Sequence, residues 1–288
     1  MQTRNQKTLR RWFEFLPVRL WWGLTRPLPF ETRAALWASL GRLLIALPLG
    51  PRRRVEKNLA LIWPNLPEAR RAEIIRAVGG NVTRGLSELL NNDQFQQRLT
   101  HFHPSGPGLD VLRAAKGKGA IIVSGHFGQW EAIRAVLQAE GLPTGAIYRD
   151  NNNGYYNDLF VRMTAEGGEP MFDSGPEGMR AMIKHLRSGG FVAILTDQKF
   201  RKGKDIPFLG HDALTSIAPA QLALKYGIPM VPAFGIRRED PNEIDIAFEA
   251  PIPPSDAETM TREINTRLSA RVETHPGQWY WLHRRWGR

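Results

Sequence analysis

The sequence predicts an α/β protein with a mostly parallel central sheet flanked by helices and a helical region at its N-terminus. From about residue 106, short apolar runs alternate with helical stretches, which is the pattern of a parallel sheet. Before that point, basic and apolar residues recur at helical spacing. The 288 residues, 42% of them hydrophobic, suffice for a sizeable core.

The first predicted element, "TLRRWFEFLPVRLWWGL", interleaves arginines with bulky apolar side chains. Such a segment is typical of a helix that lies on a bilayer surface, although its aromatic rings could instead pack onto the protein body. We expect Pro17 to break or kink it. Residues 36–50 are apolar but contain Arg42 and Pro48, and they fall short of the roughly 20 residues that a membrane span needs.

The next predicted elements are a short helix after the basic cluster at 52–54 and a long one that begins near Pro67. In the long helix, apolar residues between Ile74 and Leu90 recur at helical spacing, so we expect one buried face. We therefore divide the chain into a helical region with a membrane-associating segment (1–105) and an α/β catalytic core (106–288), which together form a single structural unit.

Strands and helices then alternate along the core. The predicted strands are "GAIIVSG", "TGAIY", "EPMF", "FVAILTD", "IPMVPAFGI" and "EIDIAFEAPI". The predicted helices are "WEAIRAVLQAEG", residues 155–167, "PEGMRAMIKHLRSGG", "IAPAQLALKYG" and a long final helix from "DAETMTREINTRLSARVET". Functional residues in such sheets follow the carboxyl ends of the strands.

His126 directly follows the buried strand "AIIVSG", and Glu131 lies five residues later. Because the chain turns back after the strand, we expect the carboxylate to reach the imidazole, hold one tautomer and stabilise the imidazolium of a general base. Two structural alternatives remain: Glu131 could complement a helix dipole, and His126 could be a loop or cap residue. Ser124 lacks the Gly-x-Ser-x-Gly context of a hydrolase nucleophile.

Composition limits the class of protein further. The chain has no cysteine, which excludes disulfides, thiolate metal sites and a cysteine nucleophile. A net charge of +11 favours an anionic partner, and nine tryptophans together with many arginines suggest an anionic membrane surface. A basic nucleic-acid-binding protein and a lipid hydrolase are the competing classes, but the sequence contains no recognised nucleic-acid-binding motif.

Five segments together resemble the lipid A biosynthesis (lauroyl/myristoyl) acyltransferases, a glycerolipid acyltransferase-like family that includes phosphatidylinositol mannoside acyltransferases. The segments are "RRRVEKNLALIWPNLPEARR", "GHFGQWEA", "YRDNNNGYYNDLFVRM", "AILTDQKFRKGKDIPFLGHDALTSIAPAQLALKYGIPMVPAF" and "HPGQWYWLHRRW". They cover about residues 40–286 in order. The first motif alone would be weak, but the series is specific.

The resemblance implies O-acyl transfer from an acyl thioester to a hydroxyl, without a cofactor, a metal or an acyl-enzyme intermediate. His126 would take the proton of the acceptor hydroxyl, and Glu131 would complete a His-acid dyad. The oxyanion would be stabilised by backbone N–H groups at Phe127 and Gly128 and by Arg149, which ends a strand on the same edge of the sheet. Arg149 could equally be an ordinary surface or phosphate-binding arginine.

Further substrate contacts are implied at the same edge and in the C-terminal motif. Asp197 would position the acceptor or Arg149, unless it is a turn cap. The other implied binding residues are Gln198, Asn152, Thr215, Arg284 and Arg285. Within the same series, Phe208 and Gly210 could shape an acyl-chain groove. Thr215 could be structural, and the two arginines could be solvated.

Two departures from the family pattern bear on function. Relatives often carry an N-terminal transmembrane helix, whereas the corresponding region here favours peripheral or monotopic binding at the cytoplasmic face of the bacterial inner membrane. Gln129 replaces the Asn that usually precedes the Trp, which could alter acceptor positioning. The donor could be acyl carrier protein or acyl-CoA. The acceptor could be a lipid A precursor, a phosphatidylinositol mannoside, or another lipid with a phosphorylated or sugar headgroup.

Overall fold

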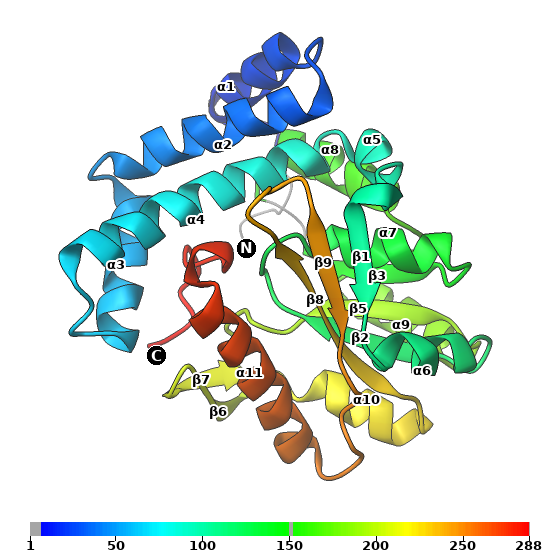
Figure 1. Ribbon diagram of the computed structural model, residues 1–288. Helices are drawn as coiled ribbons and strands as arrows, with labels where there is room; N and C mark the ends of the chain where they lie inside the picture. Colours follow the sequence, from blue (N-terminus) through cyan, green and yellow to red (C-terminus); the bar gives the residue numbers. More distant parts are fainter. Residues whose placement is uncertain (1–6, 150–151, 288) are drawn as a thin grey trace.

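The computed structural model describes residues 7–149 and 152–287, and it confirms the predicted fold class. Seven strands form the central sheet in the spatial order β1-β9-β8-β2-β5-β3-β4 (Figure 1). All neighbouring pairs are parallel except β8 and β9, which are antiparallel. The strands are β1 (Phe102–Ser105), β2 (Ala120–Ser124), β3 (Thr144–Tyr148), β4 (Met171–Asp173), β5 (Phe191–Leu195), β8 (Met230–Arg237) and β9 (Ile244–Phe248).

Helices cover both faces of this sheet, which explains why its central strands are apolar throughout. Side chains of β2 alternate between the faces: Ile122 packs with α6 and α7, whereas Ile121 and Val123 pack with α9, α10 and α11. The flanking helices are α6 (Gly108–Ala114), α7 (Glu131–Ala139), α8 (Gly154–Ala165), α9 (Pro176–Arg187), α10 (Ala218–Tyr226) and α11 (Ala257–Thr274).

The N-terminal region is helical, as predicted, and two of its helices pack closely. A Cβ added at Gly41 would lie 2.2 Å from the Gly79 carbonyl oxygen, so glycine permits the contact between α2 and α4. Pro17 lies inside α1, which continues across it, so the expected break does not occur. The elements are α1 (Leu9–Thr25), α2 (Phe30–Ala46), α3 (Gly50–Ile62), α4 (Glu68–Leu89), α5 (Asn92–Gln96) and η1 (Leu99–His101).

No single helix within the described residues combines the length and hydropathy of a membrane span. The consecutive helices α2 and α3 pass such a test only when taken together, and they are bent by 78° relative to each other.

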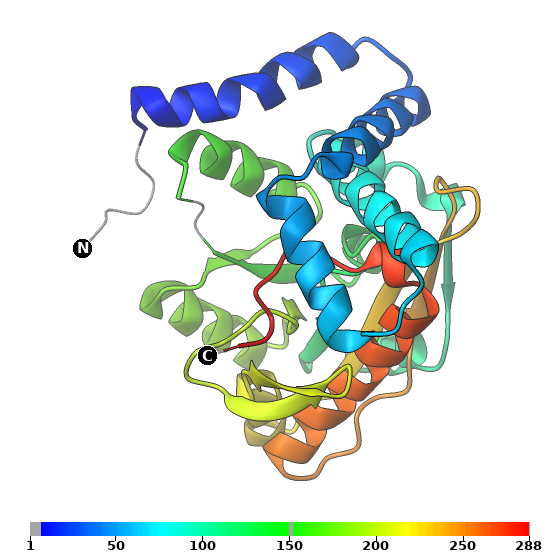
Figure 2. The ribbon, with the colours of Figure 1, turned by 90° about the vertical axis from the view of Figure 1, so that its left-hand side faces the viewer.

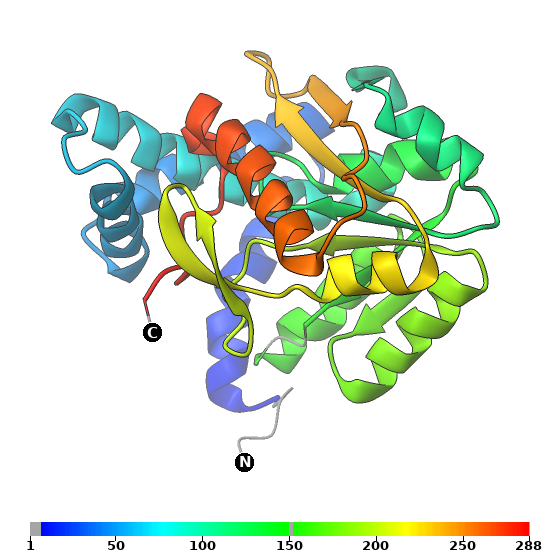
Figure 3. The same ribbon diagram turned by 90° about the horizontal axis from the view of Figure 1, so that it is seen from below.

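The C-terminal segment returns to the centre of the molecule. After α11 and η2 (Pro276–Gln278), it passes α3 (Figure 2). There the Asn58 side chain donates hydrogen bonds to the carbonyls of Trp281 and His283. A hairpin that the sequence did not predict, β6 (Lys204–Phe208) with β7 (His211–Thr215), lies beside α11 (Figure 3). The tail and the hairpin enclose the region where β2 and β5 end.

Candidate active site

The register between two neighbouring strands brings His126 and Asp197 together. In the parallel pair β2–β5, Ala120 lies beside Phe191, an offset of 71 residues. Hydrogen bonding between the two strands continues past the last pair, Ser124 and Leu195, because Thr196 N–H donates to the Ser124 carbonyl at 2.9 Å. The same offset relates His126 to Asp197, so the sheet itself places the imidazole next to this carboxylate.

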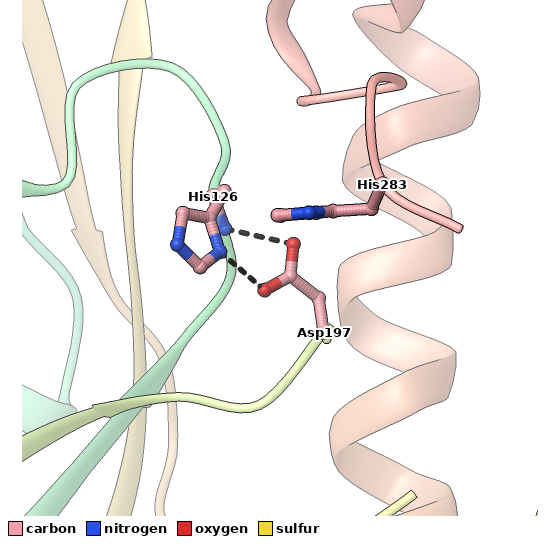
Figure 4. A group of neighbouring side chains, drawn as sticks. All are labelled: His126, Asp197 and His283. Carbon is pink, nitrogen blue, oxygen red and sulfur yellow. Dashed lines mark hydrogen bonds and ion pairs between the residues drawn. The ribbon is translucent and has the colours of Figure 1, made fainter. Parts of the chain in front are cut away.

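Asp197 is fully buried and its carboxylate receives three hydrogen bonds. Oδ1 lies 2.8 Å from Nδ1 of His126, and Oδ2 accepts from the His126 backbone N–H at 2.9 Å (Figure 4). Oδ2 also accepts from Trp279 Nε1–H at 2.8 Å. Burial acts to raise the pKa of Asp197, but the contacts with His126 outweigh it and hold the pKa below its ordinary value. The carboxylate is therefore ionised at neutral pH.

This arrangement leaves the second nitrogen of His126 available for chemistry. Because ionised Asp197 can only accept, Nδ1 carries the proton and Nε2 carries a lone pair. Nε2 points away from Asp197 (Figure 4), and its lone pair accepts a hydrogen bond from the side-chain Nε2 of exposed Gln198 at 3.3 Å, which an acceptor hydroxyl would displace. The His126 side chain is 19% exposed, so an acceptor hydroxyl can approach it. These are the requirements of a general base.

His283 is part of the site and was not identified from the sequence. Its ring lies 4.8 Å from that of His126, centroid to centroid (Figure 4). Burial, followed by the neighbouring His126, lowers the pKa of His283 to about 4, so it is neutral at physiological pH. Both His283 and Trp279 lie in the motif "HPGQWYWLHRRW", but its paired charges pointed to Arg284 and Arg285 as the binding residues.

His126, Asp197 and His283 could also be considered as metal ligands, because one atom of each lies within 4.8 Å of the others. However, the two oxygens of Asp197 already receive three hydrogen bonds, and Nδ1 of His126 is only 2.8 Å from Oδ1. A metal bound to the three residues would have to replace these contacts. The geometry therefore fits a hydrogen-bonded His–Asp pair better than a metal centre.

The predicted contact between Glu131 and His126 is wrong: the Glu131 carboxylate binds a different residue. Glu131 is buried at the start of α7, and its carboxylate accepts a hydrogen bond from Arg134 Nη1 at 2.9 Å. Arg134 also donates to backbone carbonyls of Thr144, Thr164 and Gly168, and so connects α7 with β3 and with the end of α8. The helix carries Glu131 toward Arg134, one turn further along, whereas Asp197 occupies the position at the imidazole.

Gln129 also points into the protein. Its Nε2 donates to Glu88 of α4, and its Oε1 accepts from the Glu131 backbone N–H at 3.1 Å. Glu88 is buried and accepts hydrogen bonds from Arg84 and Arg237 as well. The amide at position 129 therefore anchors the His126 loop to α4, and the expected contact with an acceptor is not what the structure shows.

The expected backbone oxyanion hole is occupied by internal hydrogen bonds. Gly128 N–H donates to the Gln278 carbonyl at 2.9 Å, and Phe127 N–H donates to the Gly125 carbonyl at 2.7 Å. Gly128 has φ +55°, and a Cβ there would lie 1.8 Å from the Gly235 carbonyl oxygen, so glycine is needed for packing. Arg149 follows β3 at the same sheet edge as His126 and is exposed, and its role stays a prediction.

The remaining residues that the sequence predicted to bind substrate are either exposed or buried. Asn152 and Arg284 are exposed. Thr215 and Arg285 are buried against each other: Arg285 Nη2 donates to Thr215 Oγ1 at 2.6 Å and Nη1 to the Leu214 carbonyl. Burial lowers the pKa of Arg285 to about 10. Phe208 is buried against Trp279 and Trp286, so it packs the tail and does not line a groove.

Comparison with known proteins decides the family. The profile of the bacterial lipid A biosynthesis acyltransferases matches residues 2–288. The chain belongs to this family. It is 26% identical over 286 residues to the lipid A biosynthesis lauroyltransferase of Escherichia coli K12, with 96% of this chain and 92% of that protein covered.

Other members show the breadth of the acyltransferase family. A lipid A biosynthesis acyltransferase of Haemophilus influenzae is 24% identical over 270 residues, covering 88% of this chain and 81% of that protein. A phosphatidylinositol mannoside acyltransferase of Mycobacterium tuberculosis H37Rv is 24% identical over 185 residues, covering 62% of this chain and 58% of that protein. The resemblance recognised in the motifs is thus confirmed, and the chain is an acyltransferase.

Proposed function

We propose that this acyltransferase moves a fatty acyl chain from an acyl thioester, carried by acyl carrier protein or coenzyme A, to a hydroxyl of a lipid A precursor or related glycolipid. The observation that carries the mechanism is the 2.8 Å contact between His126 Nδ1 and buried Asp197. It fixes the tautomer that leaves Nε2 unprotonated beside an exposed surface. Asp197 takes the orienting role that the sequence assigned to Glu131.

In the proposed reaction, the acceptor oxygen attacks the thioester carbonyl carbon while its proton passes to Nε2 of His126. The imidazolium is stabilised by Asp197, and His283 adds no competing positive charge because it is neutral. The C–S bond then breaks, and the departing thiolate takes the proton back from His126. Arg149 is our proposed oxyanion-stabilising group, because the N–H groups of Phe127 and Gly128 have internal acceptors.

The direct test is acyl transfer by the purified full chain. Acyl carrier protein or coenzyme A bearing a lauroyl group is mixed with a tetra-acylated lipid A precursor, and products are identified by mass spectrometry. Expected is one added acyl chain on the lipid with wild type and none with His126→Ala. Release of free fatty acid without acylated lipid, at the same rate with or without acceptor, would contradict transfer and favour hydrolysis.

We also propose that the N-terminal helices bind the inner membrane peripherally from the cytoplasmic side. Within residues 7–149 and 152–287, sixteen large apolar side chains are exposed, and twelve of them belong to residues 9–61. On α1, Leu9, Phe13, Leu20 and Leu24 are exposed and share one helix face by their spacing. Arginines are interspersed, which suits an interfacial helix on anionic lipid.

Vesicle co-sedimentation tests this surface. With vesicles of phosphatidylglycerol and phosphatidylcholine, the combined variant Phe13→Ser/Leu20→Ser is expected to lower the bound fraction about tenfold. The reason is that two apolar side chains, which the bilayer would bury in the bound protein, are lost. Leu224→Ser, an exposed leucine on α10, is the matched control and should bind as wild type. Equal binding by all three proteins would refute the assignment.

A further inference from the structure

A cavity rich in arginine lies on the far side of the C-terminal segment from His126. It is open to solvent, its volume is about 530 Å³, and residues of α2, α4, the η2 segment and the β8–β9 turn line it. Figure 1 shows this region where the red segment after α11 passes beneath α4. His126, Asp197 and His283 are not among its lining residues. Six arginines line it: Arg42, Arg70, Arg76, Arg84, Arg237 and Arg238.

The cavity carries more positive charge than its neighbours neutralise. Arg84 and Arg237 share one carboxylate, that of Glu88. Arg70 pairs with Glu73, and Arg238 pairs with Asp245.

Two of the arginines have no partner. Arg42 and Arg76 take part in no ion pair or hydrogen bond with any residue that the structure describes. The guanidinium of Arg42 lies across Gly80, since a Cβ there would come within 3.1 Å of Arg42 Nε. Among the described residues, three carboxylates form ion pairs with these six guanidinium groups, and Asp240 and Glu243 act on Arg84 and Arg238 at longer range, so Arg42 and Arg76 are left without an ion-pair partner.

Phosphate groups fit such a site. Planar guanidinium groups bind phosphate through paired, charge-assisted hydrogen bonds, and a concave site strengthens them relative to an open surface. The volume falls in the usual range for small-molecule sites. We propose that this cavity binds a soluble, phosphate-bearing small molecule other than the acyl donor, with Arg42 and Arg76 as the arginines free to hold it.

A soluble source is favoured over a membrane lipid by the position of the cavity. Ala38 and Arg42 line it, whereas the exposed leucines Leu36 and Leu43 lie on the opposite side of α2 by helical spacing. A bilayer in contact with those leucines would lie on the other side of the helix. The cavity also differs from the reacting site, although Gln278 in its wall accepts the Gly128 N–H of the catalytic loop.

Isothermal titration of the full chain with sodium pyrophosphate, at constant ionic strength, tests the proposal. Expected is saturable binding at one site per chain. Arg42→Gln/Arg76→Gln should weaken the affinity about tenfold or more, because each arginine supplies a charge-assisted contact. The matched control, Arg180→Gln/Arg187→Gln, removes two exposed arginines from α9 and should bind as wild type. Both variants should retain acyl transfer, which shows that they are folded.

Three results would overturn the proposal. The first is the absence of saturable binding, and the second is an equal loss in the Arg42/Arg76 and control variants. The third is complete displacement of pyrophosphate by a saturating acyl donor, which would assign the cavity to the donor. A second experiment measures binding to vesicles of phosphatidic acid and phosphatidylcholine. Wild-type binding by Arg42→Gln/Arg76→Gln supports a soluble ligand, whereas loss of vesicle binding would refute a soluble ligand and assign the cavity to lipid phosphate.

Discussion

Two buried carboxylates flank the loop that carries His126, and they serve different partners. Asp197 receives two hydrogen bonds from His126 and one from Trp279. Glu131 is bound by Arg134, whose guanidinium also donates to backbone carbonyls of β3 and of the end of α8. The comparison shows that sheet register, and not proximity along the chain, selects the acid that orients the imidazole. Asp197 orients the imidazole of His126, whereas Glu131 contributes to the packing of α7 through Arg134.

The largest effect should come from Asp197→Asn. The amide can still accept from the backbone N–H of His126 and from Trp279, so the fold should survive. It cannot stabilise an imidazolium and favours the wrong tautomer, so we expect kcat to fall about 10³- to 10⁴-fold. Steady-state transfer assays measure kcat, with the wild type as the upper reference and His126→Ala as the lower one. A variant within a factor of ten of wild type would remove Asp197 from the mechanism.

Glu131 offers the contrasting case. Glu131→Ala leaves the buried Arg134 guanidinium without its counter-charge, which should lower the free energy of unfolding by about 3–5 kcal/mol. Activity per folded molecule should fall by less than a factor of ten. Urea unfolding and transfer assays at low temperature separate the two effects. If the folded variant instead loses activity as completely as His126→Ala, Glu131 is catalytic after all, as the sequence motif suggested.

The sequence predicted six of the seven strands of the central sheet, most of the helices and the position of His126, because apolar periodicity and glycine turns are local signals. It did not predict β1, which falls at the end of the region assigned as helical, or α6. It could not select Asp197 over Glu131 as the partner of His126, because the offset between β2 and β5 is a property of the assembled sheet. The β6–β7 hairpin and His283 were missed for a related reason. Their places depend on the return of the C-terminal tail, which involves contacts such as Arg285 to Thr215.

Trp279 supplies the third hydrogen bond to Asp197. Its removal tests how much of the effect of Asp197 depends on a contact that does not involve His126. Trp279→Phe deletes a buried donor to a charged acceptor and leaves a small cavity, so we expect a loss of about 2–3 kcal/mol in unfolding free energy. Because Asp197 keeps both contacts to His126, kcat should fall only about tenfold. Urea unfolding and transfer assays measure the two values. An unchanged unfolding free energy would show that the Trp279 bond contributes nothing to the site.

The smallest effect is a dependence of stability on pH, and it comes from His283. Its pKa is about 4 in the folded chain and about 6.5 when unfolded, so the unfolded chain binds more protons between these values. Stability is therefore greatest above about pH 6.5 and falls as the pH drops toward 4. Asp197, whose folded pKa is depressed, loses its contribution only below its ordinary value and lies outside this window.

Between pH 7 and pH 5, His283 should cost about 2 kcal/mol of unfolding free energy, a loss that His283→Gln should abolish. Urea unfolding at both pH values gives the difference for each protein. If the variant does not fold, an NMR titration of ¹³C-labelled histidine in the wild type serves the same purpose, because the His283 ring should stay neutral at pH 5.5. A ring that protonates near pH 6.5 would show that burial beside His126 and Asp197 does not hold it neutral, and the stability difference would then disappear.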